Sequence, residues 1–260
     1  MKIMMLRIMR QNVRFFSNST RKMGEIKRPD VAFKIRPMRT EEIPQVVELT
    51  RLNHFHFPPS TLKFWHAQDP DGIKVAVTES GEIIGSVSNV KNTESLYVSG
   101  LFCVHENYRH AEVGKKLIRE CFAYPQGKNF AGNAKVDVVG PSLGRGARIL
   151  ESDWISLEYE TDTPVNPAIL SDELPSGVEL LAFQNNLLPA IFEYDYSLAG
   201  YDRKPVIEAS CNEENSKTLV AMKDGKCVGF GSIKLDNAEY WKIGPCMQMI
   251  PLLQKSWGKD

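Results

Sequence analysis

The chain has 260 residues, of which 42% are hydrophobic and 25% are charged, and its formal net charge at pH 7 is zero. This length allows one large domain or two modest ones with a sizeable core, and the balanced charge argues against nucleic acid as the principal partner, because phosphate binding needs a concentrated basic face. No run of 18 apolar residues occurs, so a membrane-spanning helix is not expected either.

The first 24 residues carry six basic residues and no acidic one, which leaves 26 basic and 32 acidic residues in the rest of the chain. On a helical wheel, arginines take one face and four apolar residues take the other: Met5, Met9, Val13 and Phe16. An arginine-rich, acid-free amphipathic start is typical of a mitochondrial transit peptide. We therefore expect residues 1–30 to lie outside the fold and to direct the chain to mitochondria. The alternatives are a disordered basic tail on a cytoplasmic protein, or translation starting at Met23.

The five cysteines are odd in number and show no paired spacing. This pattern favours reduced thiols over a disulfide framework. Because no CxxC motif occurs, no metal site is predicted.

The segment 35–49, IRPMRTEEIPQVVEL, predicts a short strand followed by a helix that begins near Thr40. Pro44 falls in the first turns, where a missing N–H costs little because those donors have no intrahelical partner. The following NHFHFPP, with His54 and His56, is expected to be the loop after this helix.

Residues 75–88, VAVTESGEIIGSVS, alternate apolar and polar residues around Ser80-Gly81 and predict a β-hairpin. A further strand is expected at 95–104. It leads through VHENYRHAEVGKKLI (104–118) into an amphipathic helix. A tight turn into a helix N-terminus presents unpartnered backbone N–H groups, so this loop is a candidate anion site.

Two parts of this plan recur about 145 residues later. The hairpin VAMKDGKCVGFGS (220–232) resembles 75–88, and LLAFQNNLLPAIFEY (180–194) repeats 35–49, with Pro189 lying 145 residues after Pro44. A shared offset in two elements predicts a duplicated unit. The second copy reaches a strand at 239–249 and has no room for a phosphate loop, so any anion site belongs to the first copy.

These motifs together resemble the GNAT (GCN5-related) N-acetyltransferases. The strand, loop and helix around 104–118 are similar to motif A of that family, whose loop reads R/Q-x-x-G-x-G/A. Arg109 matches its first position, Gly114 matches its last, and Glu112 replaces the middle glycine. The second half, with FEYDYSLAGYDRKP and YWKIGPC, is similar to the C-terminal half of YitH/HolE-type acetyltransferases.

The resemblance implies an α/β (α+β) fold with a mixed sheet: a GNAT acyl-CoA N-acyltransferase domain at 31–160, a linker at 161–177, and a truncated second GNAT-like half at 178–260. The strand at 129–139 would then be splayed from its neighbour to admit the pantetheine arm.

The implied activity is transfer of an acetyl group from acetyl-CoA to an amine by direct attack in a ternary complex. The backbone of Phe102, Cys103 and Val104 would pair with the pantetheine, and N–H groups near a strand bulge would polarise the thioester carbonyl. The implied pyrophosphate cradle comprises Arg109, His110, Ala111, Glu112, Val113, Gly114 and Lys115.

The amine must be neutral to attack, and a lysine-like amine is roughly 0.1% neutral near pH 7, so a base or a desolvating pocket is needed. Glu94, at the head of the strand 95–104, is the first candidate for this base, against the interpretation of a solvated turn residue. Many members of the family use a tyrosine after the fifth strand as the acid, but here no tyrosine occurs until Tyr159.

Two sets of residues are candidates for acceptor binding. His54 and His56 lie in the loop that borders the acceptor site in this family. In the second half, Tyr201, Asp202 and Arg203 could line a pocket, with Arg203 binding a carboxylate, or an Asp–Arg pair could pin a loop.

Glu112 leaves three interpretations open. In the first, its side chain points to solvent and only its backbone N–H contributes to anion binding. In the second, the carboxylate faces the phosphates and repels them by roughly 1–4 kcal/mol. In the third, the loop holds no cofactor and the chain is a catalytically weak or inactive ligand- or partner-binding module. Basic residues around the loop favour the first. The expected partners are small-molecule or peptide amines, with no nucleic acid and no membrane; a homodimer through the second half is allowed.

Overall fold

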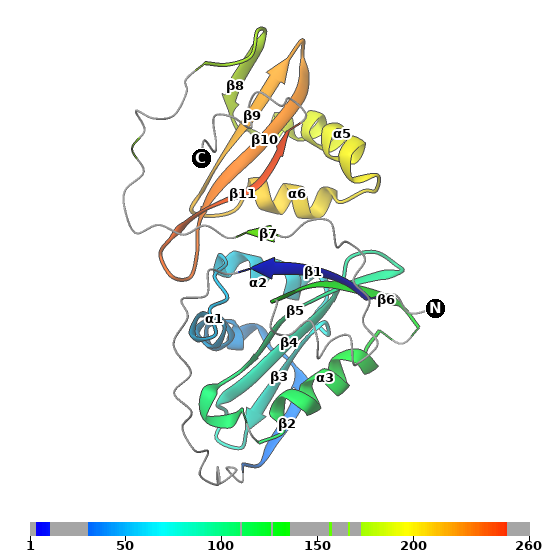
Figure 1. Cartoon of the computed structure of the whole chain (residues 1–260), viewed down its shortest axis with the longest axis vertical. Helices are drawn as coiled ribbons and strands as arrows, with labels where there is room; N and C mark the ends of the chain where they lie inside the picture. Colours follow the sequence, from blue (N-terminus) through cyan, green and yellow to red (C-terminus); the bar gives the residue numbers. More distant parts are fainter. Residues whose placement is uncertain are drawn as a thin grey trace. The chain divides into compact units, whose positions relative to one another are not determined.

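The computed structural model describes residues 4–10, 31–109, 111–125, 127–135, 156–157, 166 and 173–248. The chain divides into two compact units, Met1–Glu160 and Thr161–Asp260, and each unit builds its own sheet (Figure 1). Both units combine a sheet with helices, which is the mixed α/β class that the sequence predicted.

The first unit is a mixed sheet with helices on both faces. Its described strands are β1 (Met4–Arg10), β2 (Phe33–Pro37), β3 (Ile73–Thr78), β4 (Ile83–Lys91), β5 (Leu96–Val104), β6 (Asn129–Lys135) and β7 (Ser156–Leu157). Its described helices are η1 (Thr40–Glu42), α1 (Ile43–Leu52), α2 (Pro59–Gln68), η2 (Glu106–Tyr108) and α3 (Val113–Ala123). The strand order is β2-β3-β4-β5-β6-β1-β7, with β2 to β5 antiparallel and β6 parallel to β5.

Alternate residues of β3 pack into two separate hydrophobic cores, one on each face of this sheet. Val75 and Val77 pack with α1 and α2 on one face, whereas Ala76 packs with α3 on the other. Figure 1 shows α1 and α3 on opposite sides of the sheet. Because both faces are covered, β3 and β4 are buried at almost every position, including polar residues such as Ser86 and Asn89.

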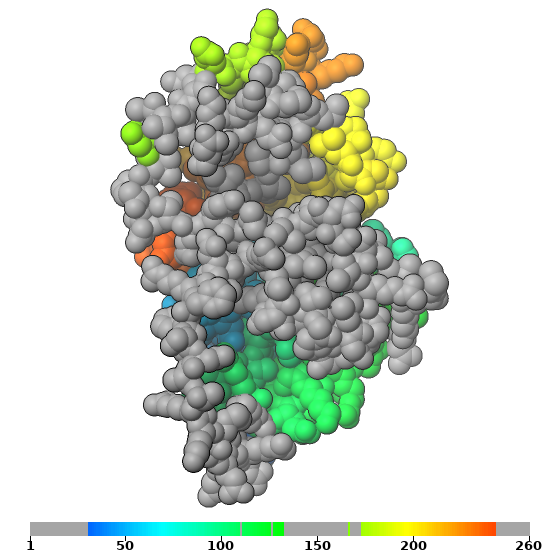
Figure 2. Space-filling view, in the orientation of Figure 1, coloured from blue at the N-terminus to red at the C-terminus, as the bar shows by residue number. Residues whose placement is uncertain are grey.

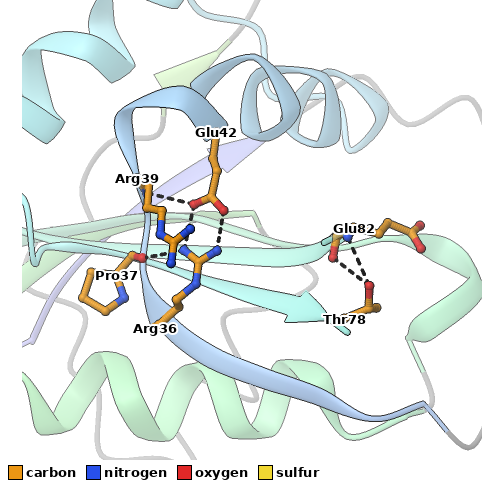
Figure 3. Close-up of polar contacts among 6 residues, drawn as sticks. All are labelled: Arg36, Pro37, Arg39, Glu42, Thr78 and Glu82. Carbon is orange, nitrogen blue, oxygen red and sulfur yellow. Dashed lines mark hydrogen bonds and ion pairs between the residues drawn. The ribbon is translucent and has the colours of Figure 1, made fainter. Parts of the chain in front are cut away.

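The junction between β2 and α1 is held by an ion pair. Arg36 donates from both terminal nitrogens to the Glu42 carboxylate, with 2.8 Å from Nη1 to Oε2, and the backbone N–H of Arg39 donates to Oε2 at 2.8 Å (Figure 3). Glu42 thereby caps the helix start. At the other end of the sheet, Thr78 closes the β3–β4 turn by bonding the backbone of Glu82 (Figure 3).

Residues 4–10 differ from the sequence prediction. They form β1, which runs parallel to β6 with Met4 opposite Phe130 and Met9 opposite Lys135, where an amphipathic helix outside the fold was expected. A strand edge offers unpaired N–H and C=O groups to any extended segment, and this pairing overrides the helical period. The targeting role of residues 1–30 stays a prediction.

The second unit is an antiparallel sheet with two helices on one face. Its described elements are β8 (Val178–Ala182), η4 (Asn185–Leu187), α5 (Leu188–Ala199), α6 (Lys204–Cys211), β9 (Ser216–Lys223), β10 (Lys226–Leu235) and β11 (Trp241–Gln248), and the strand order is β11-β10-β9-β8. The core joins Ile191 of α5 and Ile207 of α6 to Val220 and Phe230 of the sheet. The opposite side of α5 is exposed, as the yellow atoms in Figure 2 show.

The elements of the two units follow the same order at a nearly constant offset. Val178 opens β8 145 residues after Phe33 opens β2, Leu188 follows Ile43 by the same number, and Trp241 follows Leu96 by the same number. The helix pair α2 and α6, which the sequence did not predict, also begins 145 residues apart, at Pro59 and Lys204.

Candidate active site

A β-bulge interrupts β5 in the middle of the first sheet. Ser86 pairs with Cys103 and Ser88 pairs with Gly100, so the single residue Val87 of β4 faces two residues of β5, Leu101 and Phe102. Leu101 has φ = 50°, in the left-handed region that a leucine rarely adopts. The bulge overlaps, at Phe102, the segment Phe102 to Val104 whose backbone was predicted to bind pantetheine.

Just before the bulge, β5 and β6 separate. Their pairs run from Leu96–Asn129 to Ser99–Gly132 and stop there, although both strands continue. A Cβ on Gly132 would lie 2.7 Å from the Ser99 carbonyl oxygen, so this last contact depends on the glycine. Within the described residues, β6 does not pair with β5 from Gly100 onward. The predicted splay between these strands is therefore present.

The loop after β5 leads into the N-terminus of α3. Its first described intrahelical bond runs from the Lys116 N–H to the Glu112 carbonyl at 3.1 Å, so the N–H groups of Val113 to Lys115 precede any intrahelical partner. The loop is anchored to the β3–β4 hairpin at two points: His105 N–H donates to the Ile84 carbonyl at 2.9 Å, and Tyr108 Oη donates to Glu82 at 3.1 Å. The donors at the helix start are thus held rigidly.

Glu112 occupies the position that the family pattern assigns to glycine, and its backbone shows why. It is the N-cap of α3 and has φ = 60° and ψ = 8°, a left-handed conformation that glycine adopts without cost. Its side chain is 52% exposed and forms an ion pair with Lys115, with 3.4 Å between Oε1 and Nζ. This geometry favours the interpretation in which the carboxylate points to solvent.

The other predicted cradle residues take different positions. Arg109 reaches back to the Val104 carbonyl and to Asn53 Oδ1, at 3.4 and 3.3 Å, and so joins the loop to the end of α1. Val113 is buried under the sheet, and Gly114 faces the Phe102 ring, 3.0 Å from where its Cβ would be. Ala111 donates to the Tyr108 carbonyl. His110 lies outside the described residues.

Glu94 lies in the exposed turn between β4 and β5. Its side chain is 87% exposed, and its Oε1 lies 2.6 Å from Lys91 Nζ. The hydrogen bond from Lys91 holds the pKa of Glu94 below its usual value, which makes the carboxylate a weaker base. The role of base stays a prediction that this geometry does not favour.

His54 and His56 follow α1 on the same side as Arg109. The His54 backbone has φ = 60°, and the two imidazole rings are 6.5 Å apart, tilted by 39°. Because Arg109 donates to Asn53, the residue before His54, the structure brings this loop and the anion loop together. Within the described residues, no group of three or more metal-ligating side chains occurs.

The candidate acceptor residues of the second unit are occupied by contacts inside that unit. Arg203 donates two hydrogen bonds to the buried Asp195, 2.7 Å from Nε and 2.6 Å from Nη2, which favours the interpretation of a pinned loop. Asp202 accepts from the Lys204 N–H at 2.9 Å at the start of α6. Tyr201 is partly exposed.

Four cysteines of the described residues are buried thiols outside any disulfide: Cys103, Cys121, Cys211 and Cys227. Burial raises the pKa of Cys121 to about 12 and that of Cys211 to about 11, so both are protonated at neutral pH. Over the described part of the chain, none of the helices has the length and apolarity to cross a membrane.

Sequence reasoning missed Ser86, Leu101 and Asn53. Ser86 and Leu101 belong to the site only because β4 and β5 pair with a bulge. Asn53 belongs to it because the remote Arg109 donates a hydrogen bond to its side chain. None of these relations leaves a local sequence pattern, since each joins segments that are remote along the chain.

The sequence matches no protein-family model and no curated protein. Solved structures do match the fold. A proposed acetyltransferase from Pyrococcus horikoshii, 18% identical, aligns over 86% of this chain and 76% of its own, with a TM-score of 0.58. A tandem GNAT protein from the clavulanic acid biosynthesis pathway, 12% identical, aligns over 84% of this chain and 79% of its own, with a TM-score of 0.50.

Both matches span the two units, so the chain has a GNAT-like fold in which a second, smaller sheet-and-helix unit follows the first. A specific likeness of the second half to YitH/HolE-type acetyltransferases stays a prediction.

Proposed function

We propose that the chain is an N-acetyltransferase that moves an acetyl group from acetyl-CoA to the amine of a small molecule or a protein by direct attack in a ternary complex. One observation carries the proposal: a bulged strand, from which its parallel neighbour β6 has separated, leads through a short loop to a helix N-terminus whose first N–H groups precede any intrahelical partner. An extended pantetheine needs the first, and a pyrophosphate needs the second.

The residues fit an acyl-CoA. Phe102 to Val104 would add the pantetheine as a further strand, and the N–H groups of Val113 to Lys115 would hold the pyrophosphate. The Glu112 carboxylate is neutralised by Lys115 and so leaves the helix start positive. Acetyl-CoA supplies the activated acyl group as a thioester.

The Phe102 N–H belongs to the bulge, beside the point where β6 has separated from β5, and a donor there would stabilise negative charge on the thioester oxygen. The acceptor amine would approach from the loop after α1, where His54 and His56 are better placed than Glu94 to remove its proton. A ring nitrogen of a neutral imidazole can accept that proton.

Calorimetric titration with acetyl-CoA tests cofactor binding. We expect binding that Gly114→Val weakens by at least about tenfold, because each charge-assisted hydrogen bond to a phosphate contributes roughly 1.5–3 kcal/mol. Arg119→Val, an equally β-branched change on the exposed face of the same helix, is the control and should bind like the wild type. No binding at millimolar acetyl-CoA would contradict the proposal and favour a catalytically silent binding module.

A screen of small amines and peptide N-termini, read by release of the free CoA thiol, tests transfer. His54→Gln and His56→Gln are then compared with Glu94→Gln using the best acceptor. A fall in turnover confined to Glu94→Gln would restore the prediction made from sequence.

We also propose that residues 1–30 direct the chain to mitochondria, on the basis of their basic, acid-free composition. A fluorescent protein fused after residue 30 should reach mitochondria, and replacing Arg7, Arg10 and Arg14 with glutamine should leave it in the cytoplasm. Cytoplasmic fluorescence of the unmodified fusion would contradict this proposal.

A further inference from the structure

The peptide between Leu101 and Phe102 is held from inside the first sheet. The Leu101 carbonyl oxygen accepts a hydrogen bond from Ser86 Oγ at 3.0 Å and another from Cys103 Sγ at 3.3 Å. The two donor atoms are themselves 3.5 Å apart. Ser86 is 0% exposed and Cys103 is 3% exposed, so water does not compete for this acceptor.

The direction of this carbonyl determines the direction of the next N–H. In a trans peptide the C=O and N–H bonds point to opposite sides of the chain. Because the Leu101 carbonyl points toward Ser86 on β4, the Phe102 N–H points away from β4. On that side β5 has already separated from β6, whose last pair with it is Ser99–Gly132.

The burial of both side chains excludes a direct chemical role. An acyl group cannot reach the Ser86 hydroxyl or the Cys103 thiol without opening the core, so neither is a nucleophile here. What remains is the fixed peptide plane. A left-handed conformation costs a non-glycine residue roughly 1–2 kcal/mol, so Leu101 would relax if the two donors did not hold it.

We infer that Ser86 and Cys103 are positioning residues that clamp the Leu101 carbonyl and thereby present the Phe102 N–H to the thioester oxygen of bound acetyl-CoA. This inference rests on the proposed function. A donor fixed before the reaction stabilises the developing charge without reorganising, which a freely rotating peptide cannot do.

The second unit has a bulge at the corresponding register but lacks these residues. Gly231 pairs with Cys246 and Ile233 pairs with Ile243, so Gly244 and Pro245 stand where Leu101 and Phe102 stand in the first unit. Pro245 has no N–H to present. The register position of Ser86 is taken by Gly231. Both units therefore have a bulge in this strand. Only the first unit combines it with the Ser86 and Cys103 hydrogen bonds to the bulge carbonyl and with an N–H at the following residue.

Isotope-edited infrared spectroscopy of acetyl-CoA labelled with ¹³C at the thioester carbonyl measures the hydrogen bond from the Phe102 N–H to that carbonyl. The measurement does not require the amine substrate. In the wild type we expect the carbonyl band to move to lower wavenumber on binding. In Ser86→Ala, and more so in Ser86→Ala/Cys103→Ala, we expect most of that displacement to disappear. The dissociation constant should stay within a few-fold, because it depends on the other contacts. Turnover with the acceptor found by the amine screen should fall roughly tenfold, as for the loss of one oriented hydrogen bond.

Two variants separate positioning from packing. Ser88→Ala removes a hydroxyl of similar burial two residues along β4 and should leave the band unchanged. Ser86→Thr keeps the donor and should restore most of the displacement.

An unchanged band in a folded double variant that binds acetyl-CoA would overturn the inference and leave the proposed function standing. An equal loss in Ser88→Ala would also overturn it, since the effect would then be general packing. Failure of the wild type to bind acetyl-CoA would instead remove the proposed function itself.

Discussion

The two units share an order of strands and helices but differ in the residues at the bulge. Each places a strand, a short 3₁₀ turn and a helix before a second helix, a hairpin and a bulged strand, at an offset of 145 residues for most element starts. In the first unit the bulge carries Leu101 and Phe102; in the second it carries Gly244 and Pro245. The second unit shows that a GNAT-like sheet does not by itself make a site, because a bulge can stand at the same register and lack the N–H donor.

The two units also differ where the first strand meets the first helix. Arg36 and Glu42 form an ion pair in the first unit, and the residues 145 positions later are Leu181 and Leu187, which pack against the second core. One junction is held by charge and the other by apolar contact.

The largest effect is expected from moving the second bulge into the first. Leu101→Gly/Phe102→Pro keeps a bulge sequence that occurs in this protein and removes the N–H donor. We expect turnover to fall by about 10²–10³-fold, as for other losses of an oxyanion donor. Steady-state thiol release measures it. Leu101→Gly/Phe102→Ala, which keeps the N–H, is the control, and equal activity of the two variants would mean that the donor is not used.

The next effect concerns the charged junction. Arg36→Leu alone leaves the Glu42 carboxylate, only 10% exposed, without its main partner and should lower the free energy of unfolding of the first unit by ~2–3 kcal/mol. Arg36→Leu/Glu42→Leu imitates the second unit and should recover most of the loss. Urea unfolding measures both, and a double variant no more stable than the single would break the comparison.

Acid should distinguish the same junctions. The hydrogen bond from Arg36, and then the Arg39 N–H, hold the pKa of Glu42 below its usual value. The stability that this provides is complete above the unfolded-state pKa near 4.3 and is lost as the pH falls through the lower folded-state pKa. As the pH is lowered from 6 to 3, the free energy of unfolding of the first unit should fall more in the wild type than in Arg36→Leu/Glu42→Leu. Parallel pH profiles would contradict the assignment.

The separation of β5 and β6 gives a smaller effect. Gly132→Ala places a Cβ 2.7 Å from the Ser99 carbonyl oxygen and should destabilise the first unit by ~1–3 kcal/mol, because backbone atoms must move. Gly100→Ala, on the partner strand, meets its nearest atom at 3.5 Å and should cost little. Thermal unfolding compares the two, and equal stability would show that β6 does not approach β5 this closely.

The smallest effect is expected at Glu112. Glu112→Gly relieves the left-handed backbone and removes an exposed carboxylate already paired with Lys115. We expect acetyl-CoA affinity to change by less than about threefold, since exposed ion pairs contribute roughly 0–1 kcal/mol. Calorimetry at low and high salt measures it, and a hundredfold gain would mean that the carboxylate faces the phosphates.

Much of the framework was predictable because it is local. The helix start near Thr40, the hairpin around Ser80-Gly81 and the strand at 95–104 follow from apolar periodicity and turn residues. Helix α2 was missed because it begins at Pro59 within a segment with few buried apolar residues. Strand β1 was missed because a helical wheel cannot detect an open strand edge elsewhere in the fold.

By itself, the sequence determined the class of fold, the internal offset and the position of the candidate anion loop. Only the tertiary structure decided that Leu101 adopts a left-handed conformation, that Ser86 and Cys103 hold its carbonyl, and that the Glu112 side chain is exposed and paired. The physical reason is register. A periodic pattern specifies which face of a strand is buried, but the position of a bulge, and the atoms it turns toward a ligand, depend on how remote strands align.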